Sequence, residues 1–225
     1  PDVHLPEVVF PKTAFDEETK AAQQARLTAT EWAQPAIGCA SLALLNVLGR
    51  IDVTASAVGG HSFGEVTALH AAGVLSAEDF LRVARQRGER MRDAASKPGW
   101  MTAVTAAVEV LRAKIAEWGV DVVVANHNAP DQVVLSGETH AIDAVETKLK
   151  AESISFKRLN VATAFHWKVF ADSAQSFLQF LEGIPFGAPA IDVYANATAS
   201  PYTGDAKAMR MQLAQQITEP VRFVE

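Results

Sequence analysis

The spacing of apolar and polar positions along the first hundred residues predicts mainly helices. Residues 27–49 carry apolar side chains at helical spacing, which predicts a long and largely buried helix. Residues 63–73 predict a short helix closed by a glycine. An amphipathic helix is expected to begin at Ser76, with Asp79 completing a capping box. A short apolar strand at 53–62 gives this flank an α/β pattern.

The pattern changes after position 100, where short strands alternate with helices. Strands are expected at 101–106, 121–128, 131–137 and 154–161, and helices at 109–119 and 139–153. The order β-α-β-β-α-β is that of a ferredoxin-like unit. The tail adds a helix at 168–182, a strand at 191–196 and a helix at 205–217. We therefore divide the chain into a large subdomain, residues 1–100 and 162–225, interrupted by a small ferredoxin-like subdomain, residues 101–161.

A serine flanked by glycines follows the first predicted strand. Gly60 and Gly64 surround Ser62 in the order G-x-S-x-G, which holds a nucleophile on a strained strand-to-helix turn in α/β-hydrolases. In that geometry the backbone N–H of Phe63 faces the developing oxyanion, and the following helix adds its positive end. The same residues also fit an ordinary turn. The strand before them and the helix after them favour the nucleophile.

A serine nucleophile needs a general base, and histidine is the usual one. The chain has six histidines. Four of them are poor candidates for the base. The histidine beside the serine points in another direction, a second lies two helical turns away, and two others lie in polar segments that are expected at the surface. His127 and His166 remain. His166 is the better candidate because it follows the last strand of the small subdomain, where the chain re-enters the large one; a structural histidine is the alternative.

Composition narrows the classes of function. The net charge is −6 and no basic stripe is present, which argues against a nucleic-acid partner. The single cysteine, Cys39, excludes an internal disulfide framework and indicates the cytoplasm, and its apolar setting predicts a buried thiol. No cluster has the spacing of metal ligands, and no run is expected to reach the length of a membrane span. The chain begins without methionine and ends in mid-pattern, so we expect a piece of a longer protein.

Five segments along the chain carry a family resemblance. They are GHSFGE, RQRGERM, ANHNAPDQVVLSG, NVATAFH and QQITEPVRF. Their order and spacing resemble malonyl-CoA:acyl carrier protein acyltransferases, which include stand-alone fatty-acid enzymes and the acyltransferase domains of polyketide synthases. The sequence around the serine is most similar to that of iterative synthases of the polyunsaturated-fatty-acid and enediyne type. The resemblance implies an α/β fold, with an α/β-hydrolase-like large subdomain and an inserted ferredoxin-like small subdomain.

The resemblance also implies roles for individual residues. Ser62 would accept the acyl group and His166 would be its base. Arg87 would hold the free carboxylate of a malonyl group, which suits a planar guanidinium better than a lysine. Gln216 would orient the histidine. By pattern alone, Arg87 could be a solvated helix arginine and Gln216 a surface amide.

Three further residues are assigned to substrate binding. Asn128 matches an asparagine that lines the site in the family, although it could also serve a turn before proline. His61 belongs to the same serine motif. In polyketide members a phenylalanine before the catalytic histidine goes with malonyl, and a serine there goes with methylmalonyl. Phe165 therefore implies malonyl, while Thr163 departs from the histidine common in malonyl-specific domains.

Two other departures from the family pattern affect the expected activity. The N-terminal G-Q-G motif, whose glutamine supplies a second oxyanion donor, is not in the chain. Loss of one such donor typically costs about 10²–10³ in rate, so we expect this chain alone to be weak. Trp167 and Lys168 follow the histidine where the family has a small hydroxyl residue and then proline, which puts the substrate assignment in question.

The function that follows is two-step acyl transfer. A malonyl group would pass from malonyl-CoA to Ser62 and then to the phosphopantetheine thiol of an acyl carrier protein, with no bound cofactor. The partners would be that carrier and neighbouring synthase domains, such as a ketosynthase. Methylmalonyl or another acyl group remains open, as does a serine esterase or thioesterase, although the chain lacks an HGGG-type oxyanion loop. A scaffold domain without catalysis is the third alternative.

Overall fold

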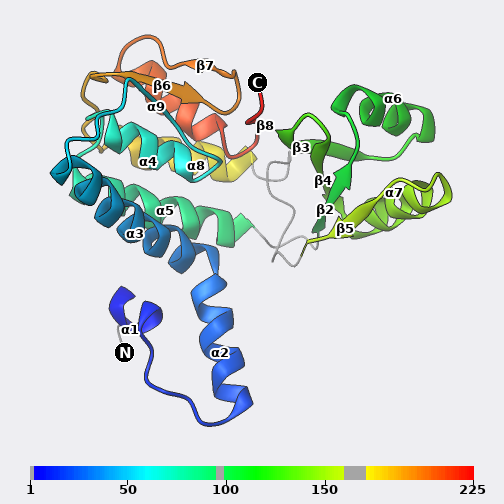
Figure 1. Ribbon diagram of the computed structural model, residues 1–225, viewed down its shortest axis with the longest axis horizontal. Coiled ribbons are helices and arrows are strands. Elements are labelled where there is room, and N and C mark those ends of the chain that lie inside the picture. Colours follow the sequence, from blue (N-terminus) through cyan, green and yellow to red (C-terminus); the bar gives the residue numbers. More distant parts are fainter. Residues whose placement is uncertain (1–2, 95–98, 160–170) are drawn as a thin grey trace.

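The computed structural model describes residues 3–94, 99–159 and 171–225 (Figure 1). The helices are α1 (Leu5–Val9), α2 (Glu17–Thr28), α3 (Thr30–Arg50), α4 (Gly64–Ala71), α5 (Ala77–Ala94), α6 (Val108–Trp118), α7 (Thr139–Ala151), α8 (Ala171–Glu182) and α9 (Ala206–Gln215). The strands are β1 (Ala57–Gly59), β2 (Gly99–Thr105), β3 (Val122–Ala129), β4 (Gln132–Glu138), β5 (Phe156–Arg158), β6 (Asp192–Ala195), β7 (Ser200–Pro201) and β8 (Val221–Arg222).

The larger part of the molecule packs helices against a small sheet. Its strands follow the order β1-β6-β7, with β1 parallel to β6 and β6 antiparallel to β7. Helices α3 and α5 run side by side (Figure 1), α4 contacts both α5 and the strands β1 and β6, and α8 packs against α5 and α9. The core is built from apolar side chains of α4, α5, α8 and α9, among them Leu69, Phe80 and Phe177. The predicted α/β class is confirmed.

The smaller part has the ferredoxin-like arrangement. Strands β2, β3, β4 and β5 form an antiparallel sheet in the order β5-β2-β4-β3, and α6 and α7 connect them in the pattern β-α-β-β-α-β. Apolar side chains on the two helices, such as Leu111 and Ile142, pack against Val133 and Leu135 of the sheet. The prediction of an inserted ferredoxin-like unit is confirmed.

The C-terminal strand β8 belongs to this second sheet. Asn126 and His127 of β3 pair in parallel with Val221 and Arg222 of β8. The sequence-based division assigns Val221 and Arg222 to the large subdomain. The backbone N–H of Arg222 also donates to the carbonyl of Asn196, just past β6 (3.0 Å). The C-terminal segment therefore connects the two parts, and the division at 101–161 stays a proposal in which β8 is shared.

Helix α3 departs from the sequence-based expectation in two ways. It was predicted to be largely buried, yet Leu44 and Val47 are 65% and 55% exposed, because α5 covers only one side of it. Cys39, predicted to be a buried thiol, is exposed for the same reason. Helical spacing identifies an apolar helix, but it does not show which of its faces the chain itself covers.

Helix α3 also corrects the statement that no run reaches the length of a membrane span. By length and composition α3 could cross a membrane, and 17% of its apolar stretch is buried. The core helix of a water-soluble protein passes the same test, so a single such helix is weak evidence of a membrane protein.

Helix α5 approaches α3 closely at Gly88. A Cβ atom at this position would lie 2.5 Å from the carbonyl oxygen of Thr30 and 2.6 Å from the Cα of Glu31. Backbone atoms cannot yield as a flexible side chain can, so Gly88→Ala should force the helices apart. We expect a loss of about 1–3 kcal/mol in the free energy of unfolding, measured by urea denaturation.

Gly49→Ala is the control for this substitution, since Gly49 also lies in a helix and an added Cβ there meets nothing within 4 Å. We expect it to be neutral or to stabilise by up to about 1 kcal/mol. Equal effects of the two substitutions would show that the α3–α5 contact is not tight at Gly88.

Candidate active site

The G-x-S-x-G segment forms a tight elbow between β1 and α4. Ser62 has a φ of 52°, in the left-handed region that L-residues seldom adopt. The chain folds back so closely that a Cβ on Gly60 would lie 2.2 Å from the backbone carbonyl of Gly64. Only glycine fits there. The elbow therefore has the strained strand–turn–helix geometry that the sequence predicts, and ordinary turn chemistry does not account for it.

The guanidinium of Arg87, on α5, lies beside this serine. Its Nη2 donates to Ser62 Oγ at 3.3 Å and to Gln216 Oε1 at 2.7 Å, and its Nη1 donates to Gln34 Oε1 at 3.0 Å. The arginine is 1% exposed, and Gln34 and Gln216 are also buried. In the described part of the chain its hydrogen-bond acceptors are thus neutral oxygens, with no carboxylate among them.

Burial lowers the pKa of Arg87 to about 10, and the charge of the nearby Glu65 carboxylate opposes that shift. Arg87 therefore stays protonated at neutral pH. A buried cation whose donors meet only neutral oxygens retains most of its attraction for an anion. The cluster at the elbow is suited to a substrate that carries a negative charge close to Ser62.

A buried carboxylate lies behind the elbow. Glu65, on α4, accepts from the backbone N–H of Asn196 (2.8 Å) and from the hydroxyl of Tyr202. Burial raises the pKa of Glu65, and the hydrogen bonds from Tyr202 and Asn196 counter part of that rise. Burial also raises the pKa of Tyr202 well above its ordinary value, so it stays a hydroxyl donor. Through its bond with Asn196, Glu65 connects the start of α4 to the end of β6.

Comparison with known proteins identifies the family. Residues 16–225 match the family model described as "Acyl transferase domain". The chain belongs to the acyl transferase domain family. Recognition of this family from the five sequence segments is confirmed.

Three similar proteins illustrate the family. The chain is 38% identical over 208 residues to the polyketide biosynthesis protein ThaF of Burkholderia thailandensis, covering 89% of this chain and 17% of that protein. It is 33% identical over 202 residues to the malonyl CoA-acyl carrier protein transacylase of Synechocystis, covering 90% of this chain and 67% of that protein.

Among solved structures, the acyltransferase domain from the second module of the salinomycin polyketide synthase superposes with a TM-score of 0.84 at 32% identity. The match covers 97% of this chain and 49% of that one. The chain thus spans about half of that domain and less than a fifth of ThaF.

The small subdomain of this acyl transferase domain reaches the elbow through β3. Asn128 Oδ1 and His61 Nε2 lie 2.8 Å apart, and the ring of His61 packs edge-on against Phe223 with centroids 5.3 Å apart. The neighbouring His127 contacts the C-terminal segment, where its Nδ1 lies 3.2 Å from Glu225 Oε1. Two predicted substrate-binding residues are therefore in contact, and His127 is engaged away from Ser62.

Apart from the pair His61 and Asn128, the predicted site residues fall into three groups. Ser62, Arg87 and Gln216 form one hydrogen-bonded cluster. Phe63 begins α4, and its ring stacks on Phe80 in the core with centroids 6.0 Å apart. His166 and Phe165 lie outside the described residues, as do Thr163, Trp167 and Lys168.

Sequence reasoning missed four residues of the cluster: Gln34, Glu65, Asn196 and Tyr202. One signal could have identified Asn196. It follows β6, which runs parallel to β1, and side chains just past the carboxyl ends of parallel strands gather at one edge of a sheet. In the described part of the chain, no group of three His, Cys, Asp or Glu side chains could hold a metal ion.

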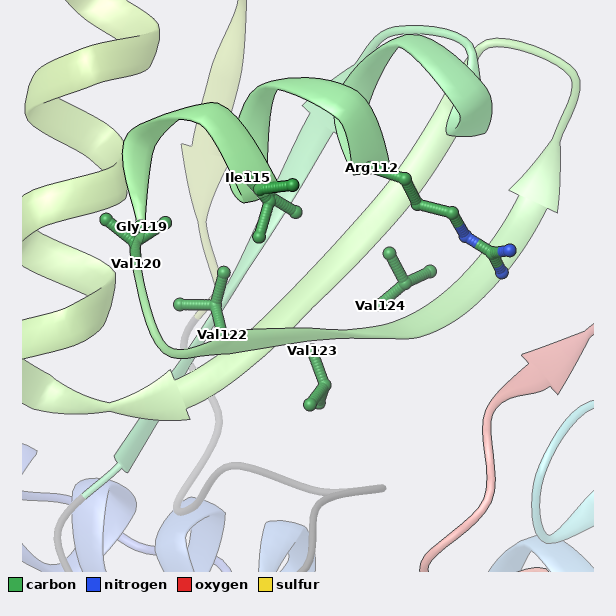
Figure 2. Close-up of a pocket in the computed structure, with 8 residues that line it drawn as sticks. Arg112, Ile115, Gly119, Val120, Val122, Val123 and Val124 are labelled. Carbon is green, nitrogen blue, oxygen red and sulfur yellow. The ribbon is translucent and has the colours of Figure 1, made fainter.

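A separate pocket lies on the small subdomain, between α6 and β3 (Figure 2). Its lining residues are Arg112, Ile115, Ala116, Gly119, Val120, Val122, Val123 and Val124. Arg112 is their one ionisable side chain, and the lining contains no nucleophile. The pocket therefore lacks the chemistry found at the elbow.

The Glu65–Tyr202 contact makes a testable contribution to stability. The folded pKa of Glu65 is raised above its ordinary 4.5, so the stability that it contributes is complete below that value and is lost as pH rises through the folded pKa. Tyr202→Phe removes a donor to the carboxylate and raises that pKa further. We expect the substitution to cost about 1–3 kcal/mol at pH 8 and clearly less at pH 4.

Urea denaturation at several pH values measures this difference. Tyr194→Phe is the control, because Tyr194 is the chain's other tyrosine and is 45% exposed. A Tyr202→Phe loss of equal size at both pH values would contradict an ionised Glu65 as the acceptor.

Proposed function

We propose that the chain transfers a malonyl group from malonyl-CoA to the phosphopantetheine thiol of an acyl carrier protein, through an ester on Ser62. Ser62 Oγ attacks the thioester carbonyl as His166 takes its proton. The C–S bond breaks, and coenzyme A leaves as a thiol protonated by His166. The pantetheine thiol then gives its proton to His166 and attacks the ester carbonyl. The ester C–O bond breaks, and Ser62 Oγ takes that proton back from His166. The part given to His166 rests on the family resemblance.

The observation that carries this proposal is the 3.3 Å contact between Arg87 Nη2 and Ser62 Oγ. A malonyl group bound to Oγ would carry its free carboxylate two carbon atoms beyond the ester carbonyl. That length brings the carboxylate within reach of a guanidinium that contacts Oγ itself. Charge-assisted hydrogen bonds from a buried arginine are strong and geometrically specific, so a dicarboxylic acyl group fits this site better than an acetyl group.

The elbow also offers stabilisation for the reaction. The backbone N–H of Phe63 and the N-terminal end of α4 lie directly after the nucleophile, where the negative charge of a tetrahedral intermediate develops. Negative charge there would be favoured by the helix dipole and by Arg87. We place His61 and Asn128, which contact each other from the two subdomains, beside the acyl-CoA.

The partners follow from the same chemistry and from the relatives' names. The Synechocystis relative is named for malonyl-CoA and acyl carrier protein, and ThaF is named for polyketide biosynthesis. We therefore propose a carrier protein as the acyl acceptor and a polyketide or fatty-acid synthase, with a ketosynthase among its neighbouring domains, as the setting. A chain with one cysteine and no internal disulfide suits the cytoplasm.

Intact-protein mass spectrometry after brief exposure to malonyl-CoA tests the acyl-enzyme. We expect a malonyl adduct on the wild-type protein and none on Ser62→Ala. Arg87→Ala should lower the rate of malonyl labelling by about 10²-fold, since it removes charge-assisted hydrogen bonds to the carboxylate, and should change acetyl labelling far less. Arg87→Lys should fall between the two.

Arg82→Ala is the control, because Arg82 lies on the same helix but is exposed and paired with Asp79 at 2.9 Å. Thermal unfolding of each variant shows that the protein is folded. A malonyl adduct that does not depend on Arg87 would overturn the role of the guanidinium. No adduct from any acyl-CoA on a folded protein, with its natural flanking sequence included, would favour a scaffold domain, and rapid release of free acid would favour a thioesterase.

The choice between malonyl and methylmalonyl is tested at Phe165. If the phenylalanine fills the space of an α-methyl group, Phe165→Ser should raise methylmalonyl labelling relative to malonyl labelling by at least about tenfold. Competition between the two acyl-CoA donors, read by mass spectrometry, gives this ratio directly. An unchanged ratio would show that residues other than Phe165 determine the choice of acyl group, and Trp167→Ser would be the next variant.

A further inference from the structure

The side chain of Asn196 spans the elbow. Its Nδ2 donates to the carbonyl oxygen of Gly60 at 2.8 Å, and its Oδ1 accepts from the backbone N–H of Ser62 at 2.6 Å. Both bonds cross more than 130 residues of sequence, and Asn196 is buried. One carboxamide therefore joins the backbone before the nucleophile to the backbone of the nucleophile itself.

The same carboxamide leads to the arginine. Asn196 Oδ1 also accepts from Gln216 Nε2 at 3.4 Å, and Gln216 Oε1 accepts from Arg87 Nη2 at 2.7 Å. A continuous path of hydrogen bonds thus runs from the Ser62 backbone to the guanidinium. A change in the position of Asn196 would alter both the nucleophile and the group beside it.

Asn196 is itself held from two sides. Its backbone N–H donates to Glu65 Oε2, and its backbone carbonyl accepts from the N–H of Arg222 on β8. Glu65 is fixed in turn by the hydroxyl of Tyr202. The position of Asn196 is set by α4, β6 and β8 together, so its side chain is a fixed reference point for the elbow.

We propose that Asn196 is the positioning residue that holds Ser62 in its left-handed backbone conformation and aims its Oγ. The inference rests on the proposed function for its acyl-CoA readout, but it also concerns the reactivity of Ser62 with any acylating reagent. A carboxamide is required because it supplies a donor for Gly60 and an acceptor for Ser62 in one plane. An ionised aspartate keeps the acceptor and loses the donor, and alanine loses both.

Two rates test the proposal, with each variant checked for folding by thermal unfolding. The first is the rate at which a fluorophosphonate labels Ser62, which requires no acyl-CoA. The second is malonyl labelling as a function of malonyl-CoA concentration. For Asn196→Ala we expect both the fluorophosphonate rate and the saturating malonyl rate to fall about 10²-fold, as expected for a misplaced reacting atom. The half-saturating concentration of malonyl-CoA should change less than threefold.

Asn196→Asp should show a smaller loss of at least about fivefold in both rates, and it serves as the test should the alanine variant fail to fold. Asn126→Ala is the control, since Asn126 is equally buried (5%) but lies on β3 of the small sheet. It should destabilise the protein without a comparable loss of labelling.

The outcomes separate this inference from the proposed function. Wild-type rates in folded Asn196→Ala, or in Asn196→Asp where the alanine variant does not fold, would overturn the positioning role. A raised half-saturating concentration with an unchanged saturating rate would also overturn it, because that pattern indicates a binding role. Fluorophosphonate labelling of the wild type without a malonyl adduct would contradict the proposed function and leave the Asn196 comparison intact. A wild-type Ser62 that fluorophosphonate does not label would overturn both.

Discussion

The buried charge of Arg87 is the constraint on which the rest of the site depends. A guanidinium that is 1% exposed loses the hydration that stabilises it in water, and the lowered pKa reflects that loss. Three elements compensate by directing polar oxygens at it: Gln34 from α3, Ser62 from the elbow and Gln216 from the end of α9. The close approach of α5 to α3 at Gly88 makes the first of these contacts possible. The hydroxyl of Ser62 is thus one of the groups that solvate the buried guanidinium.

The second constraint is the shape of the elbow. Parallel pairing of β1 with β6 brings the end of each strand to one edge of the sheet, where Asn196 meets Gly60 and Ser62. The C-terminal strand β8 then connects this edge to the small sheet (Figure 1). Asn128 of β3 contacts His61 at the elbow. The position of the small subdomain beside the elbow is therefore a consequence of the same strand ends that hold Ser62.

Local sequence patterns predicted the local features well. Ser76 caps the start of α5 as expected, with its Oγ accepting from the N–H of Asp79 at 3.0 Å. The strand–glycine–serine–glycine–helix order predicted the elbow because its residues are close in sequence. The order of elements predicted the ferredoxin-like sheet because that order is typical of one known arrangement of strands. The contacts of Arg87 with Gln34 and of Ser62 with Asn196 span 53 and 134 residues, and no periodicity encodes them. The exposure of Cys39 was likewise not predictable, since it depends on which face of α3 another element covers.

The most direct test of the central claim is the affinity of the Ser62→Ala protein for malonyl-CoA and for acetyl-CoA, measured by calorimetry without turnover. The two ligands differ in one carboxylate, so the ratio of their dissociation constants reports what Arg87 contributes to binding. If the buried guanidinium receives the carboxylate, malonyl-CoA should bind at least about tenfold more tightly, which corresponds to about 1.4 kcal/mol. Equal affinities would contradict the account, because Arg87 would then contribute nothing to the binding of the malonyl carboxylate.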